Sequence, residues 1–141
     1  MLKWGSVRIA KEATAVDWQI RAIRGATTVP ENSVEAIAAA VTELLDAVEL
    51  GNPLDPERIV SVTFSATRDL DSVFPAAIAR SRPQWDDVPL LDVQQMHVKG
   101  SLPRCIRLMI HLYLPAHQSE VSHAYLRGAR HLRPDLCLTS D

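Results

Sequence analysis

The segment from residue 33 to residue 51 has the pattern of one long amphipathic helix, which needs an apolar layer to pack against. Its apolar residues recur at spacings of three and four, namely Val34, Ile37, Ala38, Val41, Leu44, Leu45 and Val48. Asn32 followed by Glu35 resembles a capping box, with Ser33 as the competing N-cap. Gly51 is a natural end for the helix. The rest of the chain must supply the apolar layer.

Three later segments have the composition of β-strands. Residues 59–65 (IVSVTFS) are rich in β-branched side chains, and residues 105–114 form a clear apolar run. Residues 88–98 are a third candidate, although Gln94 and Gln95 are unusual inside a strand. These segments can form the layer that the helix covers.

Residues 17–26 alternate with a period of two, which predicts a fourth strand. Trp18, Ile20 and Ala22 fall on one face of it. Arg24 lies on the same face, at the carboxyl end of the strand. A cation on an apolar strand face is either a surface residue whose charged end reaches water or a residue that contacts a ligand.

Shorter elements complete the predicted order. Residues 75–80 form a short helix whose first turn accepts a proline, and residues 116–123 form a polar helix. Residues 124–132 fit either a helix or an edge strand. Strands outnumber helices, and the helices would cover one face of a mixed sheet, so the predicted class is α+β. One main helix leaves the other sheet face bare, which predicts association with a partner.

The overall composition is that of one globular domain. The chain has 141 residues, of which 47% are apolar and 23% charged. A net charge of −2 and a pI near 6.2 provide no basic field for nucleic acid, although a local arginine cluster can still bind a small anion. No apolar run approaches the roughly 20 residues of a membrane span. Residues 1–16 lack the apolar core of a secretory signal, and we expect a flexible extension there before a domain at residues 17–141.

The cysteines and histidines predict neither a disulfide framework nor a metal site. Two cysteines fit a reduced protein of the cytosol. The five histidines have none of the spacings that are typical of metal ligands. We therefore expect no metal and no cofactor.

Several motifs in order resemble one known family, the monofunctional trimeric chorismate mutases of the AroH class in bacilli and cyanobacteria. The motifs are RAIRGATTV (21–29), SATRDLDSVFPAAIAR (65–80), WDDVPLLDVQQM (85–96), GSLPRCIRLMI (100–110) and HAYLRGARHLRPDLCLT (123–139). The resemblance extends from about residue 20 to residue 139. It implies a ferredoxin-related α+β subunit, a cytoplasmic homotrimer with a barrel-like core, and active sites between adjacent subunits.

The resemblance also implies a reaction, the intramolecular Claisen rearrangement of chorismate to prephenate for phenylalanine and tyrosine biosynthesis. This reaction needs no nucleophile, general base or cofactor. An enzyme can accelerate it by restraining the substrate in a near-attack geometry and by stabilising charge on the ether oxygen. Because the substrate is a dicarboxylate, arginines are the expected binding groups.

The resemblance assigns the central roles to three residues. Arg107 is the main electrostatic residue at the ether oxygen and a carboxylate; the alternative is an arginine that pairs with other surface groups. Arg24 is a carboxylate clamp, and Tyr125 adds a hydroxyl donor unless it is a packing residue.

Four more residues correspond to the edges of the family's site. Phe74 and Leu132 resemble apolar walls, although ordinary core packing predicts nearly the same contacts. Arg80 and Arg133 resemble arginines at the mouth of the site, where they would attract the substrate. They could equally be solvated charges.

The sequence departs from the family at residue 95. Known members have a glutamate there that contacts the ring hydroxyl of the substrate, whereas this chain has Gln95. Asp92 stands where a cysteine is familiar, and we hypothesise that its carboxylate replaces the missing charge. Strand alternation opposes this hypothesis, because residues 92 and 95 would face opposite sides unless the strand bends.

Two other functions remain open at this point. One is a trimeric protein that binds chorismate or a related dicarboxylate without converting it. The other is an unrelated α+β module whose arginines pair with acidic neighbours. Loss of the ultraviolet absorbance of chorismate on mixing would distinguish an enzyme from the first alternative.

Overall fold

The computed structural model describes residues 16–137, so the predicted extension at residues 1–16 lies almost wholly outside the described part. Five strands form one mixed sheet in the order β3-β2-β4-β1-β5. The bounds of the strands are β1 Trp18–Thr28, β2 Ile59–Ala66, β3 Leu90–Gln94, β4 Cys105–Pro115 and β5 Ala124–Tyr125. The α-helices are α2 Val34–Gly51 and α3 Pro75–Arg80. Four short 3-10 helices complete the fold: η1 Pro56–Arg58, η2 Ala116–Gln118, η3 Arg127–His131 and η4 Pro134–Leu136.

The long helix forms where the periodicity predicts it. Its buried residues, Ile37, Ala40, Val41, Leu44, Leu45 and Val48, make up one face. Ser33 is the N-cap, since its side chain accepts a hydrogen bond from the backbone N–H of Ala36. Asn32 is not the cap and instead bonds to the loop at Asp71 and Ser72.

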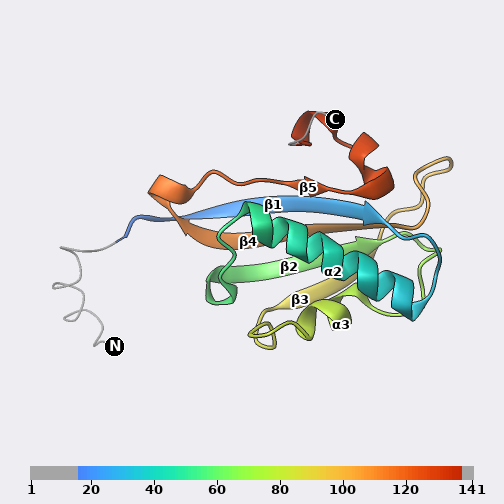
Figure 1. Cartoon of the computed structure of the whole chain (residues 1–141), viewed down its shortest axis with the longest axis horizontal. Coiled ribbons are helices and arrows are strands. Elements are labelled where there is room, and N and C mark those ends of the chain that lie inside the picture. The colour runs from blue at the N-terminus through green and yellow to red at the C-terminus, as the bar shows by residue number, and fades with distance from the viewer. Residues whose placement is uncertain (1–15, 138–141) are drawn as a thin grey trace.

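The core lies between α2 and one face of the sheet, and Figure 1 shows the helix lying along the strands. That face is formed by alternate residues of the central strands, including Ile23, Val62, Phe64, Ile106, Leu108, Ile110 and Leu112. β1 and β4 pair antiparallel along their whole length, from Trp18 opposite Pro115 to Thr28 opposite Cys105. Because the pairing is unbroken, one register applies along both strands, and this register determines which side chains share a face.

The opposite face of the sheet carries exposed apolar side chains. They are Trp18, Ile20, Leu91, Val93, Met109 and Tyr113, each between 38% and 59% exposed. The registers put these residues on the side away from α2, because their paired positions alternate with the core residues. The prediction of a bare sheet face is therefore confirmed for the described residues.

Three predicted elements differ from the structure. The strand expected at residues 88–98 is only Leu90–Gln94. In the described part of the chain, β3 pairs with β2 alone, and β2 ends at Ala66. The polar helix expected at residues 116–123 is only η2. The ambiguous segment 124–132 contains both alternatives in succession, the two-residue β5 and then η3. In the described part of the chain, no helix is long and apolar enough to cross a membrane.

Candidate active site

Four adjacent strands bring their side chains into one row on the bare face of the sheet. Ser65 of β2 is opposite Arg107 of β4, and Arg107 is opposite Ala26 of β1. Ala26 is in turn opposite Tyr125 of β5. Residues that are directly opposite in a sheet share a face, so Arg107 and Tyr125 lie on the same side, with only the small Ala26 between them.

Arg24 joins this row, because it is two residues before Ala26 on β1 and shares its face. Arg24, Arg107, Tyr125 and Arg133 all line one open cleft of about 350 Å³. The sequence had placed these four residues in one site, and the structure brings them together. Thr63, Ser65 and Met109 also line this cleft and were not predicted. The alternation of side chains along β2 and β4 would predict these three residues only if the pairing register of the two strands were already known.

Gly25 has a steric reason to be glycine. A Cβ built at this position would lie 3.1 Å from Leu108 Cδ1 and 3.3 Å from the carbonyl oxygen of Ala124. Leu108 belongs to β4 and Ala124 to β5, so the three strands pack closely at Gly25. Gly25 is the residue next to Arg24, whose side chain points to the opposite face of the sheet.

The electrostatics of the cleft are those of an anion site. Arg107 is exposed, and it lies beside the buried thiol of Cys105, whose pKa is raised by burial although Arg107 acts to lower it. The Arg133 guanidinium binds the Asp135 carboxylate through two contacts, Nε to Oδ1 at 3.1 Å and Nη2 to Oδ2 at 2.9 Å. This ion pair raises the pKa of Arg133 and lowers that of Asp135. Arg133 is thus held at the rim, already partly neutralised.

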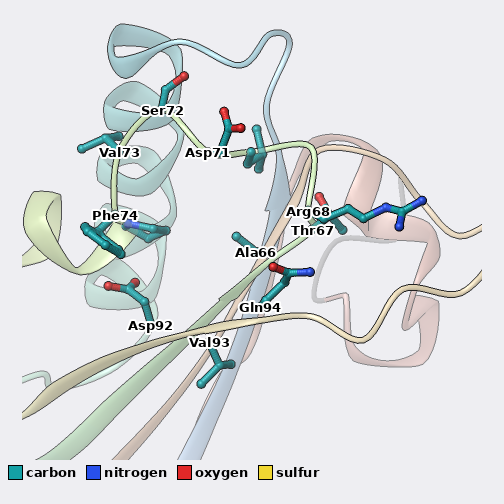
Figure 2. Close-up of a pocket in the computed structure, with 12 residues that line it drawn as sticks. Ala66, Thr67, Arg68, Asp71, Ser72, Val73, Phe74, Asp92, Val93 and Gln94 are labelled. Atoms are coloured by element: carbon teal, nitrogen blue, oxygen red, sulfur yellow. The ribbon is translucent and has the colours of Figure 1, made fainter.

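A second cavity of about 500 Å³ lies elsewhere on the chain, between the loop before α3 and the edge strand β3. Figure 2 shows Phe74 and Asp92 on its wall, together with Val93 and Gln94. Phe74 is 69% exposed, which is unusual for so large an apolar side chain. The predicted wall residue Phe74 and the predicted residue Asp92 are therefore separated from the arginine cleft within one chain.

Asp92 does not lie beside Arg107. It is opposite Phe64, a core residue, whereas Val93 is opposite Ser65 and shares the face of Arg107. Figure 2 shows Asp92 and Val93 on opposite sides of the strand. The Asp92 carboxylate accepts a hydrogen bond from the backbone N–H of Ala76 at 3.0 Å, in the first turn of α3. Burial raises its pKa, while Ala76 and Arg80 act to lower it.

Within one chain, this geometry does not support the hypothesis that the Asp92 carboxylate replaces the charge missing at residue 95. β3 keeps its parallel ladder with β2 from Leu90 to Gln94, so Asp92 and Val93 face opposite sides of the sheet. The ladder ends at Gln94, so it determines the side of Asp92 but not that of Gln95. The Asp92 side chain lies on the helix side of the sheet, where its carboxylate is hydrogen-bonded to the first turn of α3.

Gln95 follows β3 immediately, and its backbone N–H still donates to the carbonyl of Ala66 at 2.9 Å. Its side-chain Oε1 is buried, and no residue in the range 16–137 donates a hydrogen bond to it. A buried acceptor without a donor costs about 1–3 kcal/mol, so the Gln95 side chain is left unsatisfied among the described residues.

The other two predicted residues line neither cavity. Leu132 is partly buried at the end of η3, and Arg80 is exposed at the last residue of α3. Within residues 16–137, no group of three or more His, Cys, Asp or Glu side chains is arranged to hold a metal ion.

Comparison with known proteins gives one consistent result. A family model described as chorismate mutase type I matches residues 20–136. Chorismate mutase AroH of Bacillus subtilis (strain 168) is 41% identical over 122 residues, covering 86% of this chain and 96% of the relative. The protein of the same name from Thermus thermophilus is 44% identical over 118 residues, covering 83% and 96%. The solved structure of a chorismate mutase from Clostridium thermocellum has a TM-score of 0.74 at 39% identity, covering 79% of this chain and 98% of that one.

Proposed function

Because this chain belongs to the chorismate mutase type I family, it is a chorismate mutase, an isomerase that forms prephenate, and we propose that the cleft around Arg24 and Arg107 is its catalytic centre. The reaction is a step of aromatic amino-acid biosynthesis. The observation that carries the proposal is the joint position of two arginines and a tyrosine on one sheet face. The catalytic domain corresponds to residues 17–141.

Arg107 acts on the reacting bond. As the ether bond of chorismate lengthens, its oxygen gains negative charge that the ground state does not have. A guanidinium fixed on a central strand opposes this charge without having to reorganise, and such preorganised donors lower the barrier more than they strengthen substrate binding. Arg107 is a good candidate because β4 is paired on both sides, which holds its backbone rigidly.

Arg24 and Tyr125 bind a carboxylate of the substrate. The planar guanidinium matches a carboxylate with two parallel hydrogen bonds, and the tyrosine hydroxyl adds another donor. Together they restrain the flexible side chain of chorismate over the ring, where the new bond forms. Arg133 attracts the dianion at the rim, although the Asp135 carboxylate offsets part of its charge.

A homotrimer completes the site. The chain carries two open half-sites, the arginine cleft and the cavity of Phe74 and Asp92, and the family resemblance assigns the residues of both to one site. When the bare sheet faces meet around a barrel-like core, the second cavity of one subunit closes over the arginine cleft of the next. Phe74 then becomes an apolar wall, with Leu132 opposite and Arg80 at the mouth. Asp92 keeps α3 in place beneath Phe74.

Gln95 binds the ring hydroxyl of chorismate. The substrate hydroxyl is a donor, and Gln95 Oε1 has no donor among the described residues. Because this oxygen is buried in the single chain, the side chain must turn toward the substrate to accept the bond. The glutamine provides this hydrogen bond but no negative charge, so it orients the ring without stabilising positive charge on it.

The test is the loss of the diene absorbance of chorismate with formation of prephenate, measured on the purified protein and on Arg107→Ala. Turnover by the wild type and its near loss in the variant are the expected result. Binding of chorismate without loss of absorbance would instead support the dicarboxylate-binding alternative. We place the enzyme in the cytoplasm, where Cys105 and Cys137, both free thiols here, would remain reduced.

A further inference from the structure

His123 makes an unusual contact with the strand that carries Arg24. The backbone N–H of Arg24 donates to the imidazole Nδ1 of His123 at 2.9 Å. The proposed mechanism gives no role to this histidine, although it is the first residue of the segment 123–139 that resembles the family. The contact lies on the β5 side of β1, one residue before the β1–β5 pairing begins.

The imidazole extends this pairing by one residue. β5 contributes only two paired positions, Ala124 opposite Gly25 and Tyr125 opposite Ala26. At Arg24 the ladder has no β5 partner, and His123 Nδ1 takes the place of the missing carbonyl acceptor. The side chain thus attaches the start of β5 to β1, and Tyr125 is a residue of this same short strand.

The charges around His123 favour its neutral form. Burial lowers its pKa, and the guanidinium groups of Arg24 and Arg133 lower it further. The nearby carboxylate of Asp135 is engaged with Arg133. Only a neutral imidazole with its hydrogen on Nε2 can accept at Nδ1, so the lowered pKa and the hydrogen bond agree.

We propose that His123 is the positioning residue for Arg24, and that protonation of its imidazole in mild acid releases the arginine from its catalytic orientation. A protonated Nδ1 carries a hydrogen directed at the Arg24 N–H, so the bond cannot exist in the charged state. The inference rests on the proposed role of Arg24 as a carboxylate clamp.

Two substitutions separate positioning from packing. The amide oxygen of His123→Asn can occupy the place of Nδ1, whereas the oxygen of His123→Gln lies nearer the place of Nε2. Neither side chain titrates. His117→Gln is the matched control, because His117 is an exposed histidine of η2 outside the cleft.

The measurement is kcat and KM for chorismate between pH 5 and pH 8. For the wild type and His117→Gln, we expect kcat/KM to fall in acid with a midpoint below the ordinary histidine pKa of about 6.5. His123→Asn should keep most of the neutral-pH activity and lose this acid limb. His123→Gln should raise KM roughly five- to tenfold at every pH, with a smaller effect on kcat.

Two results would overturn the inference: an unchanged acid limb in His123→Asn, or equal activity of the Asn and Gln variants. If His123→Gln does not fold, the pH profile of His123→Asn still tests the inference by itself. Arg24→Ala, assayed in parallel, separates this inference from the proposed clamp. If Arg24→Ala leaves KM unchanged, the clamp is wrong; if it raises KM while the His123 variants behave as the wild type, only the role of His123 is wrong.

Discussion

The carboxylate of Asp92 accepts a hydrogen bond from the backbone N–H of Ala76 at 3.0 Å, which joins the edge strand β3 to the first turn of α3. Phe74 immediately precedes this helix and forms a wall of the second cavity. The hydrogen bond therefore links the edge strand to the helix that Phe74 precedes. We expect Asp92 to affect the site through this helix, and not by placing charge beside Arg107.

Asp92 can be tested by separating its charge from its hydrogen bond. Asp92→Asn keeps an acceptor for Ala76, and kcat should stay within about twofold of the wild type. Because burial raises the pKa of Asp92, the folded state binds this proton more tightly than the unfolded state. The ionised group thus costs stability above that pKa, and Asp92→Asn should be at least as stable as the wild type at pH 7.

Asp92→Leu is the matched variant, since it leaves the Ala76 N–H without an acceptor. The free energy of unfolding should fall by about 1–2 kcal/mol in a urea titration. A drop in kcat of more than about tenfold in Asp92→Asn would mean that the carboxylate acts on the substrate, as the hypothesis from the sequence holds.

Substitution of Arg107 should lower kcat, whereas substitution of Arg133 should raise KM. Arg107→Ala removes charge aimed at the developing oxyanion, and kcat should fall by a factor of about 10³ or more. Arg133→Ala removes a rim charge that Asp135 already pairs, so KM should rise by a factor of about three to ten with little change in kcat. Steady-state kinetics measure both effects. Arg82→Ala, whose arginine pairs with Asp46 and Glu49 of α2, is the control. Equal and mild effects at residues 107 and 133 would contradict this division.

Gln95→Glu restores the carboxylate that the family resemblance predicts. An anion near ring atoms that become electron-poor should raise kcat by roughly three- to tenfold, about 1 kcal/mol of barrier. The gain should disappear in acid as the new carboxylate is protonated, which a pH profile would show. Gln95→Leu, which removes the acceptor, should raise KM instead. A Gln95→Glu enzyme slower than the wild type would show that the site is built around a neutral residue.

The bare sheet face should hold the subunits together. Ile20 is opposite Tyr113 on this face and is 50% exposed in the single chain. Ile20→Lys should shift the sedimenting species from the mass of three 15.6-kDa chains to that of one, with loss of turnover as the half-sites separate. Leu50→Lys is the control, because Leu50 is more exposed at 91% but lies on α2. A monomeric Ile20→Lys protein with full activity would disprove a site shared between subunits.

Asp69 supports the turn that leads into β4. Its carboxylate accepts from the hydroxyl of Thr67 and from the backbone N–H of Arg104, whose φ of 44° lies in the left-handed region. Slight burial raises the pKa of Asp69, but these hydrogen bonds outweigh it, and the net shift is downward. The stabilisation is thus present above the unfolded pKa and is lost as the pH falls through the lower folded pKa.

Asp69→Asn should therefore lower the free energy of unfolding by about 1 kcal/mol at pH 7, and the difference should shrink as the pH falls below the ordinary aspartate pKa of about 3.9. Urea unfolding at constant protein concentration is the measurement. The exposed Asp86→Asn should stay within about 0.5 kcal/mol of the wild type. A pH-independent difference at residue 69 would contradict the assignment.

Much of the architecture could be read from local patterns. The spacing of apolar residues along 34–48 predicts α2, and the composition of 59–65 and 105–114 predicts β2 and β4 within a residue or two. The motif resemblance grouped Arg24, Arg107, Tyr125 and Arg133, and all four line one cleft. The predictions of the helix and strands succeed because amphipathic periodicity and β-strand composition are properties of consecutive residues.

Other features depended on partners far away in the sequence. β3 stops at Gln94 because β2, the one strand beside it among residues 16–137, stops at Ala66. Asp92 belongs to the helix side because its pairing partner Phe64 is a core residue. The sequence by itself thus determined the fold class, the main elements and the family, since each is encoded in local pattern or motif. Tertiary structure alone decided that Asp92 bonds to α3 and that His123 bonds to the strand of Arg24. The first hydrogen bond joins residues 16 positions apart and the second joins residues 99 positions apart. Such bonds depend on strand register and on the path of the loops, which no local pattern encodes.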